Sequence, residues 1–242
     1  MLLARPIISI ILLCFSQSLQ AQTITWAGRA WKVTNGGMAG VAKGNPANVR
    51  IDNDRYLHLR IVKRHGKWTA SELFTVEDFG FGTYQWIVEG NVYDMDKTTV
   101  LGLFLYGPAH HIGVNAENEI DIEFSKWSDT CHGCNADFTV YPSTGNRKHD
   151  GTSAWEDNFY VAGTTLTTAR IEWAPDHIVF TLMNGVHPIG TTAEVIKSET
   201  YSSDSKNIPQ VPLPVGINLW CFRGMPATSQ SVIIRSFEFA PK

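Results

Sequence analysis

Three acidic side chains alternate with apolar ones over residues 118–124, whose sequence is NEIDIEF. In a β-strand this alternation places Glu119, Asp121 and Glu123 on one face and the two isoleucines and the phenylalanine on the other. In a helix Asp121 would point away from the two glutamates, and the β-branched pair would be a poor choice. We therefore predict a strand that carries a row of three carboxylates on one face.

The spacing of this row suits paired acid/base chemistry. The Cα atoms of Glu119 and Glu123 would lie about 13 Å apart at the rise of a strand. If the two side chains lean toward each other over the shorter Asp121, their carboxyl groups approach the roughly 5–5.5 Å separation that retaining glycoside hydrolysis uses. One glutamate would then be the nucleophile and the other the acid/base. A solvated acidic strand or a calcium site is the alternative interpretation of such a run taken alone.

The elements that must position this row are also strands. Apolar and polar residues alternate with a period of two over most of the chain, and no stretch offers an amphipathic helix of three turns. Turn residues separate the runs, as at Asn35-Gly36-Gly37, Asn53-Asp54 and Asn184-Gly185. The pattern predicts an all-β antiparallel sandwich or barrel in a single domain. The predicted strands are 31–33, 48–51, 56–62, 83–88, 138–141, 168–173, 178–182, 215–220 and 232–239.

Composition excludes several classes of protein. The 242 residues are 43% hydrophobic and 18% charged, which excludes a disordered chain and a polytopic membrane protein. A formal charge of -3 gives no bulk attraction to nucleic acid or anionic lipid, so we expect neither as a partner.

The first 21 residues have the layout of a secretory signal peptide. Arg5 precedes an apolar run over residues 6–15, which is followed by polar residues and by Ala21 before the expected cut. We therefore expect a signal peptide over 1–21, one domain over 22–242, and a secreted or periplasmic location.

Export places the remaining cysteines where disulfides can form. Cys14 leaves with the leader, and Cys131, Cys134 and Cys221 remain. A redox pair or a zinc site lacks the surrounding pattern that either would need. We expect one structural disulfide and one buried free thiol, and the sequence leaves open which two cysteines pair.

The acidic run resembles the catalytic strand of glycoside hydrolase family 16, which includes lichenases, laminarinases, agarases and xyloglucan-active enzymes. Further segments resemble this family in the same order, so that the resemblance extends over most of residues 26–240. These segments are Phe81–Tyr84, Val100–Tyr106, Trp173–Phe180 closed by Asn184-Gly185, and Ile217–Trp220.

The resemblance implies a concanavalin A-like jelly-roll sandwich of two curved antiparallel sheets, with a cleft along the concave face. It implies that Glu119 is the nucleophile, that Glu123 is the acid/base, and that Asp121 hydrogen-bonds the nucleophile. Because three carboxylates in one row make full ionisation costly, we predict that Glu123 is the one held protonated in the free enzyme.

The spacing of the motif also bears on the substrate. One residue separates Asp121 from Glu123, as in the lichenase and xyloglucan branch, whereas the laminarinase and agarase branch has two. This favours a β-glucan with 1,4 linkages. Asn118 stands where lichenases have Asp, no Trp precedes it, and the loop over residues 125–135 differs from theirs. These departures leave the identity of the glucan open.

Four further residues are candidates for contact with the sugar. Glu72 resembles a family residue that contacts sugar hydroxyls, and Asp137 lies where a polar side chain commonly faces the substrate. Trp220 is an expected sugar platform, although a buried Trp is also ordinary in sandwiches. Trp127 could stack on sugar or anchor its loop.

We expect no cofactor and no catalytic metal. A structural calcium occurs in relatives of the family, but no motif in this sequence identifies one. His110, His111 and His149 show no ligand spacing and are interpreted as loop residues. We expect a monomer whose partner is a polysaccharide.

The leading hypothesis is a secreted retaining endo-β-glucanase, and two others compete with it. A non-catalytic carbohydrate-binding jelly roll would share the fold, because a fold does not establish chemistry. A transglycosylase would use the same residues but transfer the glycosyl group to another sugar.

Overall fold

The structure, a computed structural model, describes residues 22–107, 118–141 and 155–242. Strands dominate these ranges, which contain short 3₁₀ turns and no α-helix. The predicted signal peptide lies outside the described residues, as do His110, His111 and His149. Within the described ranges, no helix is long and apolar enough to span a membrane.

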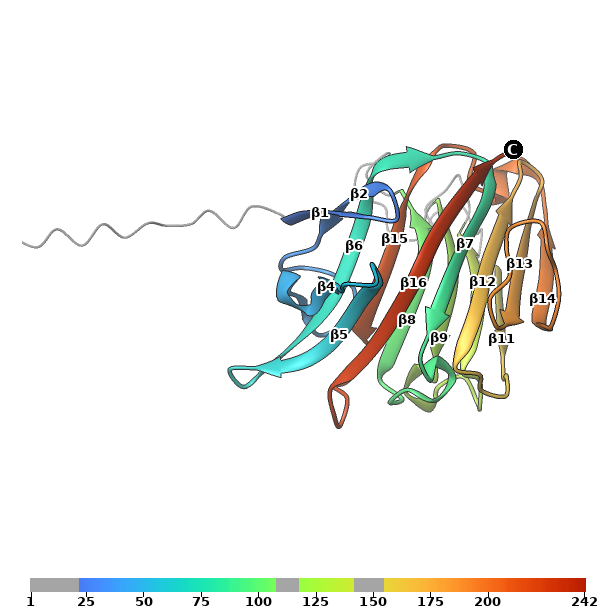
Figure 1. Ribbon diagram of the computed structural model, residues 1–242. Helices are drawn as coiled ribbons and strands as arrows, with labels where there is room; N and C mark the ends of the chain where they lie inside the picture. Colours follow the sequence, from blue (N-terminus) through green and yellow to red (C-terminus); the bar gives the residue numbers. More distant parts are fainter. Residues whose placement is uncertain (1–21, 108–117, 142–154) are drawn as a thin grey trace, which may run out of the picture.

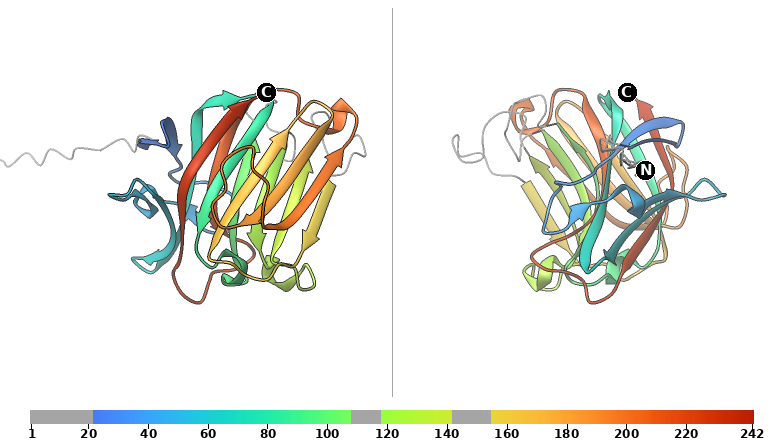
Figure 2. Two further views of the ribbon diagram at one scale, coloured as in Figure 1. Left: turned by 45° about the vertical axis from the view of Figure 1, so that its right-hand side comes forward. Right: turned by 90° about the vertical axis from the view of Figure 1, so that its left-hand side faces the viewer.

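The strands form two curved layers packed face to face, as seen in Figure 1 and from two further sides in Figure 2. The first layer has the spatial order β11 (Trp155–Phe159), β10 (Ala136–Tyr141), β9 (Glu119–Ser125), β8 (Thr99–Tyr106), β15 (Leu213–Cys221), β6 (Lys67–Phe79), β2 (Arg29–Val33) and β1 (Gln22–Trp26). The second has the order β4 (Val49–Ile51), β5 (Leu57–Arg64), β16 (Gln230–Pro241), β7 (Gly82–Glu89), β12 (Leu166–Trp173), β13 (His177–Asn184) and β14 (Val195–Ser202). The short β3 (Lys43–Gly44) pairs in parallel with β6, whereas the other strand pairs of the described residues are antiparallel.

One hairpin joins the layers. The end of β5 over 62–64 pairs with the start of β6 over 67–69, although β5 otherwise belongs to the second layer and β6 to the first. The two predicted sheets are therefore two layers of one continuous sheet that folds over on itself. This architecture confirms the predicted all-β jelly-roll sandwich in a single domain.

The core lies between the layers and explains the alternation in the sequence. The side chains of Ile120, Ile122 and Phe124 are 0% exposed and point from β9 toward the second layer. Phe138 on β10 stacks on Phe180 of β13 with ring centroids 4.7 Å apart, which ties one layer to the other. Because the apolar side of β9 is buried here, its acidic side must face away from the core.

Candidate active site

The outer face of β9 carries the predicted row of carboxylates. Asp121 is only 4% exposed, whereas Glu119 and Glu123 are partly exposed on either side of it. The strand prediction is therefore confirmed from Glu119 onward, with Asn118 just before the strand, and the three carboxylates share one face.

The register of the first layer extends this row across the neighbouring strands. Glu123 pairs with Gly102 on β8 and with Asp137 on β10, and Gly102 in turn pairs with Asn218 on β15. Asn218 pairs with Glu72 on β6, so five strands contribute to one transverse line.

Gly102 is required where this line crosses β8. A Cβ at this position would lie 2.5 Å from the side-chain oxygen of Asn218, and that oxygen already accepts a hydrogen bond of 3.1 Å from the Gly102 amide. Any larger residue would therefore displace Asn218 from the centre of the outer face.

Two cavities adjoin the carboxylate row and share Tyr141. The first, of about 550 Å³, lies on the Glu119 side. It is lined by Met38, Ala39, Glu72, Phe74, Phe104, Tyr106, Glu119, Tyr141 and Asn218. The second, of about 350 Å³, lies on the Glu123 side. It is lined by Glu123, Trp127, Thr130, Cys131, Asp137, Thr139, Tyr141, Glu156, Asn158 and Phe222.

Burial makes all three carboxyl groups of the row hard to ionise. It raises the pKa of Glu119 to about 8, while a hydrogen bond with Asp121 opposes the shift. The pKa of Asp121 is raised well above its ordinary value by burial, by the charges of Glu119 and Glu123, and by that same hydrogen bond. Because this hydrogen bond lowers the pKa of Glu119 and raises that of Asp121, Asp121 holds its proton more tightly than Glu119 does.

Glu123 also has a raised pKa. Its pKa is raised well above the ordinary value by burial first and then by the charges of Asp137 and Glu119. This direction supports the expectation that Glu123 keeps its proton, which stays a prediction.

Asp137 is buried beside Glu123 and is held by two donors. The indole Nε1 of Trp127 donates to its Oδ1 at 2.8 Å, and the hydroxyl of Thr139 donates to its Oδ2 at 3.2 Å. Burial raises its pKa to about 7 although both hydrogen bonds lower it. Asp137 lies in the wall of the cavity where contact with a substrate was predicted.

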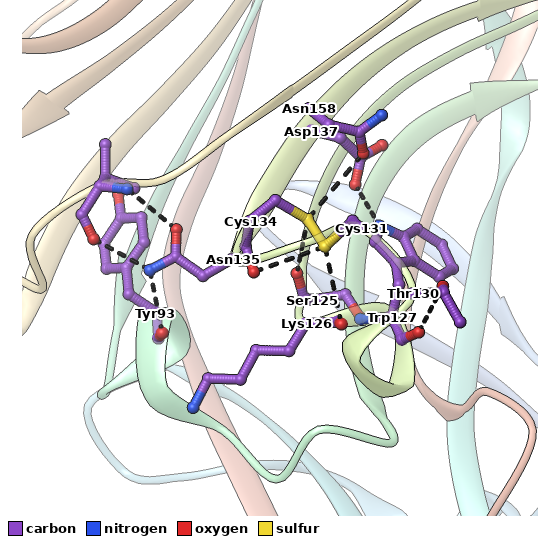
Figure 3. Close-up of a disulfide and its surroundings, with 11 residues drawn as sticks. Tyr93, Ser125, Lys126, Trp127, Thr130, Cys131, Cys134, Asn135, Asp137 and Asn158 are labelled. Atoms are coloured by element: carbon purple, nitrogen blue, oxygen red, sulfur yellow. Dashed lines mark hydrogen bonds between the residues drawn. A yellow bond between two sulfur atoms is a disulfide. The ribbon is translucent and has the colours of Figure 1, made fainter.

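The loop between β9 and β10 holds Trp127 in place. Cys131 and Cys134 form a disulfide beside the Trp127–Asp137 hydrogen bond (Figure 3). Cys221 is a buried free thiol. One disulfide and one free thiol were predicted, and the structure now identifies the pair.

The backbone of this loop is unusual. Trp127, Ser128 and Asp129 lie in succession in the left-handed region, with φ of 46°, 53° and 63°, and His132 follows with φ of 53°. This region is unfavourable for residues other than glycine. Left-handed residues that persist in a folded protein are typical of functional sites, where surrounding contacts hold them.

Trp127 belongs to an aromatic cluster at the end of the Glu123 cavity. Its ring centroid lies 4.9 Å from Phe222 and 6.0 Å from Trp220. Trp220 is partly exposed, and a Cβ on Gly40 would lie 2.4 Å from its ring. Trp220 thus packs against the segment around Gly40 and lies beside Trp127, and its role as a sugar platform stays a prediction.

Glu72 lies on the far side of the row, in the Glu119 cavity. It is 7% exposed and accepts a hydrogen bond of 2.9 Å from the Thr34 hydroxyl. Burial raises its pKa, while hydrogen bonds with Thr34 and Asn218 oppose the shift. Glu72 and Glu119 thus line one cavity, and Asp137, Trp127 and Glu123 line the other.

The sequence interpretation missed several residues of the site. Tyr106 and Tyr141 flank Glu119 on the adjacent strands, and Phe104 and Thr139 flank Asp121. Counting in steps of two along the segment Val100–Tyr106, which resembles a family strand, and along the predicted strand 138–141 would have placed all four on the acidic face. Among the described residues, no cluster of three His, Cys, Asp or Glu side chains suits a metal ion.

Solved structures share this fold. A Bacillus licheniformis β-glucanase superposes with a TM-score of 0.63 at 19% identity, covering 88% of this chain and 92% of its own. A family 16 endo-glucanase from Bacteroides ovatus superposes with a TM-score of 0.62 at 11% identity over 87% and 94%. A protein described as a pseudo β-1,3-glucanase of Mycobacterium tuberculosis does so with 0.62 at 19% identity over 88% and 91%.

No family model and no curated protein matches the chain by sequence. The likeness to the solved structures nevertheless shows that the chain has the fold of the family 16 glycoside hydrolases.

Proposed function

We propose that this chain is a family 16 glycoside hydrolase that cleaves a β-glucan with retention of configuration, in a secreted or periplasmic location. One observation carries the proposal. A row of three carboxylates lies where two cavities meet, with Glu119 facing one cavity and Glu123 facing the other. The β-glucanases that share the fold support the same conclusion.

The proposed reaction is a double displacement. The carboxylate of Glu119 attacks the anomeric carbon while Glu123 gives its proton to the glycosidic oxygen, which leaves with its bonding electrons. A glycosyl ester of Glu119 remains. Glu123 then removes a proton from water, whose oxygen attacks the anomeric carbon and releases Glu119.

Asp121 and the cavities complete the machinery. When Glu119 is ionised, Asp121 donates a hydrogen bond to it, which stabilises the negative charge of the nucleophile and of the carboxylate that later departs. The cavities are large enough for sugar units on both sides of the bond to be cleaved. Trp127 and Trp220 offer aromatic surface beside the Glu123 cavity.

The test uses mature protein with barley glucan, laminarin, xyloglucan and agarose. Reducing ends and transfer products are measured for the wild type, Glu119→Gln and Glu123→Gln, with Glu238→Gln on the second layer as the matched control. We expect cleavage of a glucan with 1,4 linkages, loss of it in both site variants, and normal cleavage in the control. NMR of the first product should show the β-anomer.

Other results would favour the competing functions. Binding of a glucan without cleavage would favour a non-catalytic carbohydrate-binding protein, and one solved structure with this fold is described as a pseudo β-1,3-glucanase. Products longer than the substrate would favour a transglycosylase. First products of the α configuration would contradict retention.

A further inference from the structure

We propose that Asp137 is a positioning residue that acts through Glu123: its negative charge, fixed by Trp127, keeps the transferable proton on Glu123. The inference rests on the proposed function for the role of that proton. It concerns a fourth carboxylate, which belongs to the next strand and lies outside the three-carboxylate motif.

The geometry brings the two carboxyl groups together. Glu123 on β9 and Asp137 on β10 are direct partners in the antiparallel register, and both side chains line the same cavity. Directly opposed residues have Cβ atoms about 4.5–5.5 Å apart. Asp137 is 3% exposed, so water screens its charge poorly. Two carboxylates so placed cannot both ionise without a large cost.

The hydrogen bonds determine which of the two is charged. An indole N–H can only donate, so Trp127 requires an acceptor at Asp137 Oδ1. Thr139 donates to the other oxygen, so both oxygens of Asp137 accept. Glu123 has weaker support, because the Nε1 of Trp220 lowers its pKa but lies buried without a well-formed hydrogen bond. Asp137 is therefore the group that ionises first, and Glu123 is the group that keeps its proton.

The surrounding charges act in the same direction. From β9, Glu119 faces Glu123 across Asp121, and from β11 Glu156 raises the pKa of both Glu123 and Asp137. Asp157 also raises the pKa of Asp137, and it is paired at 2.8 Å with Lys197 of β14. Asp137 is nevertheless the foremost of the charges that act on Glu123, ahead of Glu119.

The arrangement matters in both halves of the reaction. When Glu123 releases its proton to the leaving oxygen, two adjacent carboxylates remain, and their repulsion is relieved when Glu123 takes a proton from water. Asp137 thus makes Glu123 a stronger base in the second step, and the proton count is unchanged over the cycle.

The experiment measures the titration of the carboxyl groups directly. Protein labelled with carbon-13 at the Glu and Asp carboxyls is titrated by NMR as wild type, Asp137→Asn, Trp127→Phe and Glu156→Gln. In Asp137→Asn we expect the pKa of Glu123 to fall by about one unit or more, because a like charge is gone. Glu156→Gln should shift Glu123 less. Trp127→Phe should raise the pKa of Asp137, and it provides the test should Asp137→Asn fail to fold.

Activity supplies a second readout. The alkaline limb of the kcat/KM profile should move to lower pH in Asp137→Asn by the same amount as Glu123, with KM nearly unchanged. An unshifted Glu123, or a raised KM with an unshifted limb, would overturn the proposal and identify Asp137 as a sugar contact. If the wild type cleaves no glucan while Asp137→Asn still shifts Glu123, the proposed function fails and the pairing stands.

Discussion

Glu119 and Glu123 differ in the cavity each faces and in the neighbour each has. Glu119 accepts a hydrogen bond from Asp121 on its own strand, whereas Glu123 lies opposite a carboxylate that Trp127 holds. One strand thus carries two glutamates in different electrostatic environments, as a nucleophile and an acid require.

Substrates with different leaving groups should separate these roles. Glu123→Gln should lower kcat/KM on the glucan by about 10²–10⁴-fold, the usual contribution of general acid catalysis. On an aryl glucoside whose phenol leaves without protonation, the rate of glycosylation should change little. Glu119→Gln should lose both activities, because no nucleophile remains. Release of phenol in a pre-steady-state burst measures the step, and equal losses on both substrates in Glu123→Gln would contradict the assignment.

At the scale of residues, the sequence predicted which side chains share a face but not which of them are neighbours across strands. Alternation was enough to place Glu119, Asp121 and Glu123 on one face, because the opposite face is apolar throughout. The pairing of Glu123 with Asp137 depends on the register across the 126–135 loop, and no local pattern encodes it. The same register brings Tyr141 beside Glu119, whereas alternation over 138–141 indicates only the face on which Tyr141 lies.

At the scale of the elements, the loop over 126–134 contains residues in the unfavourable left-handed region, and several contacts hold it in place. The amide of Ser128 donates to the Lys97 carbonyl at 2.7 Å, and its hydroxyl donates to the Phe222 carbonyl at 3.0 Å. The Cys131–Cys134 disulfide closes the turn that follows. These contacts hold Trp127 against Asp137.

Removing the disulfide should loosen this loop. Closing so short a loop contributes about 2 kcal/mol through the entropy of the unfolded chain. Cys131→Ser with Cys134→Ser should therefore lower Tm by about 4–8 °C for a domain of this size. Because Trp127 loses its support, KM for the glucan should rise more than kcat falls. Calorimetry and kinetics check both effects. Reductant should reproduce them in the wild type and change nothing in the double variant, and an unchanged Tm and KM would contradict the prediction.

A second element stabilises the layer opposite the site. Arg170 of β12 is 2% exposed and donates to Gln85 of β7 and to the carbonyls of Pro188 and Thr191. It fastens the connection between β13 and β14 to the outer face of the second layer.

Arg170→Met should therefore affect stability and not catalysis. It leaves the buried Gln85 Oε1 and the partly exposed carbonyls of Pro188 and Thr191 without their donor, which costs about 1–3 kcal/mol. Urea unfolding should show this loss, while kcat and KM on the glucan should match the wild type. Reduced kcat in a fully folded Arg170→Met protein would show that the two layers are coupled.

The strands themselves were unequally predictable. Every run predicted from alternation lies in an observed strand, apart from residue ends. The longest strand, β6, was not predicted. Its residues 70–73 are all buried, so apolar and polar side chains do not alternate there. The edge strand β14 was missed for a different reason, since over Lys197–Ser202 polar residues occupy the half-buried face as well as the exposed one, so that no apolar alternation marks it.

For the whole molecule, the buried carboxylates make stability depend on pH. The folded protein raises the pKa of Glu119 to about 8 and of Asp137 to about 7, so it binds more protons than the unfolded chain above their ordinary values. Stability contributed by these groups is complete at acid pH and is lost as pH rises through the raised values. Asp52 and Asp94 act oppositely, because hydrogen bonds to His58 and Lys126 lower their pKa values.

Thermal unfolding as a function of pH tests this dependence. The wild type should have its highest Tm near about pH 5 and lose stability toward pH 8. Glu119→Gln should flatten this slope and have the higher Tm at pH 8, because a neutral amide has no charge to bury. Identical slopes for the two proteins would show that Glu119 titrates normally.

The reactivity of the free thiol at the end of β15 reports how often this end of the site opens. Cys221 is fully buried, and this burial is the main reason that the pKa of its thiol is raised to about 11. The carbonyl of Cys221 accepts a hydrogen bond from the Val41 amide. A thiol reagent can therefore reach it only after the neighbouring segment lifts away. The labelling rate of native protein should be slow and should fall further with a bound oligosaccharide, whereas immediate labelling would show that this end of the cleft stands open in solution.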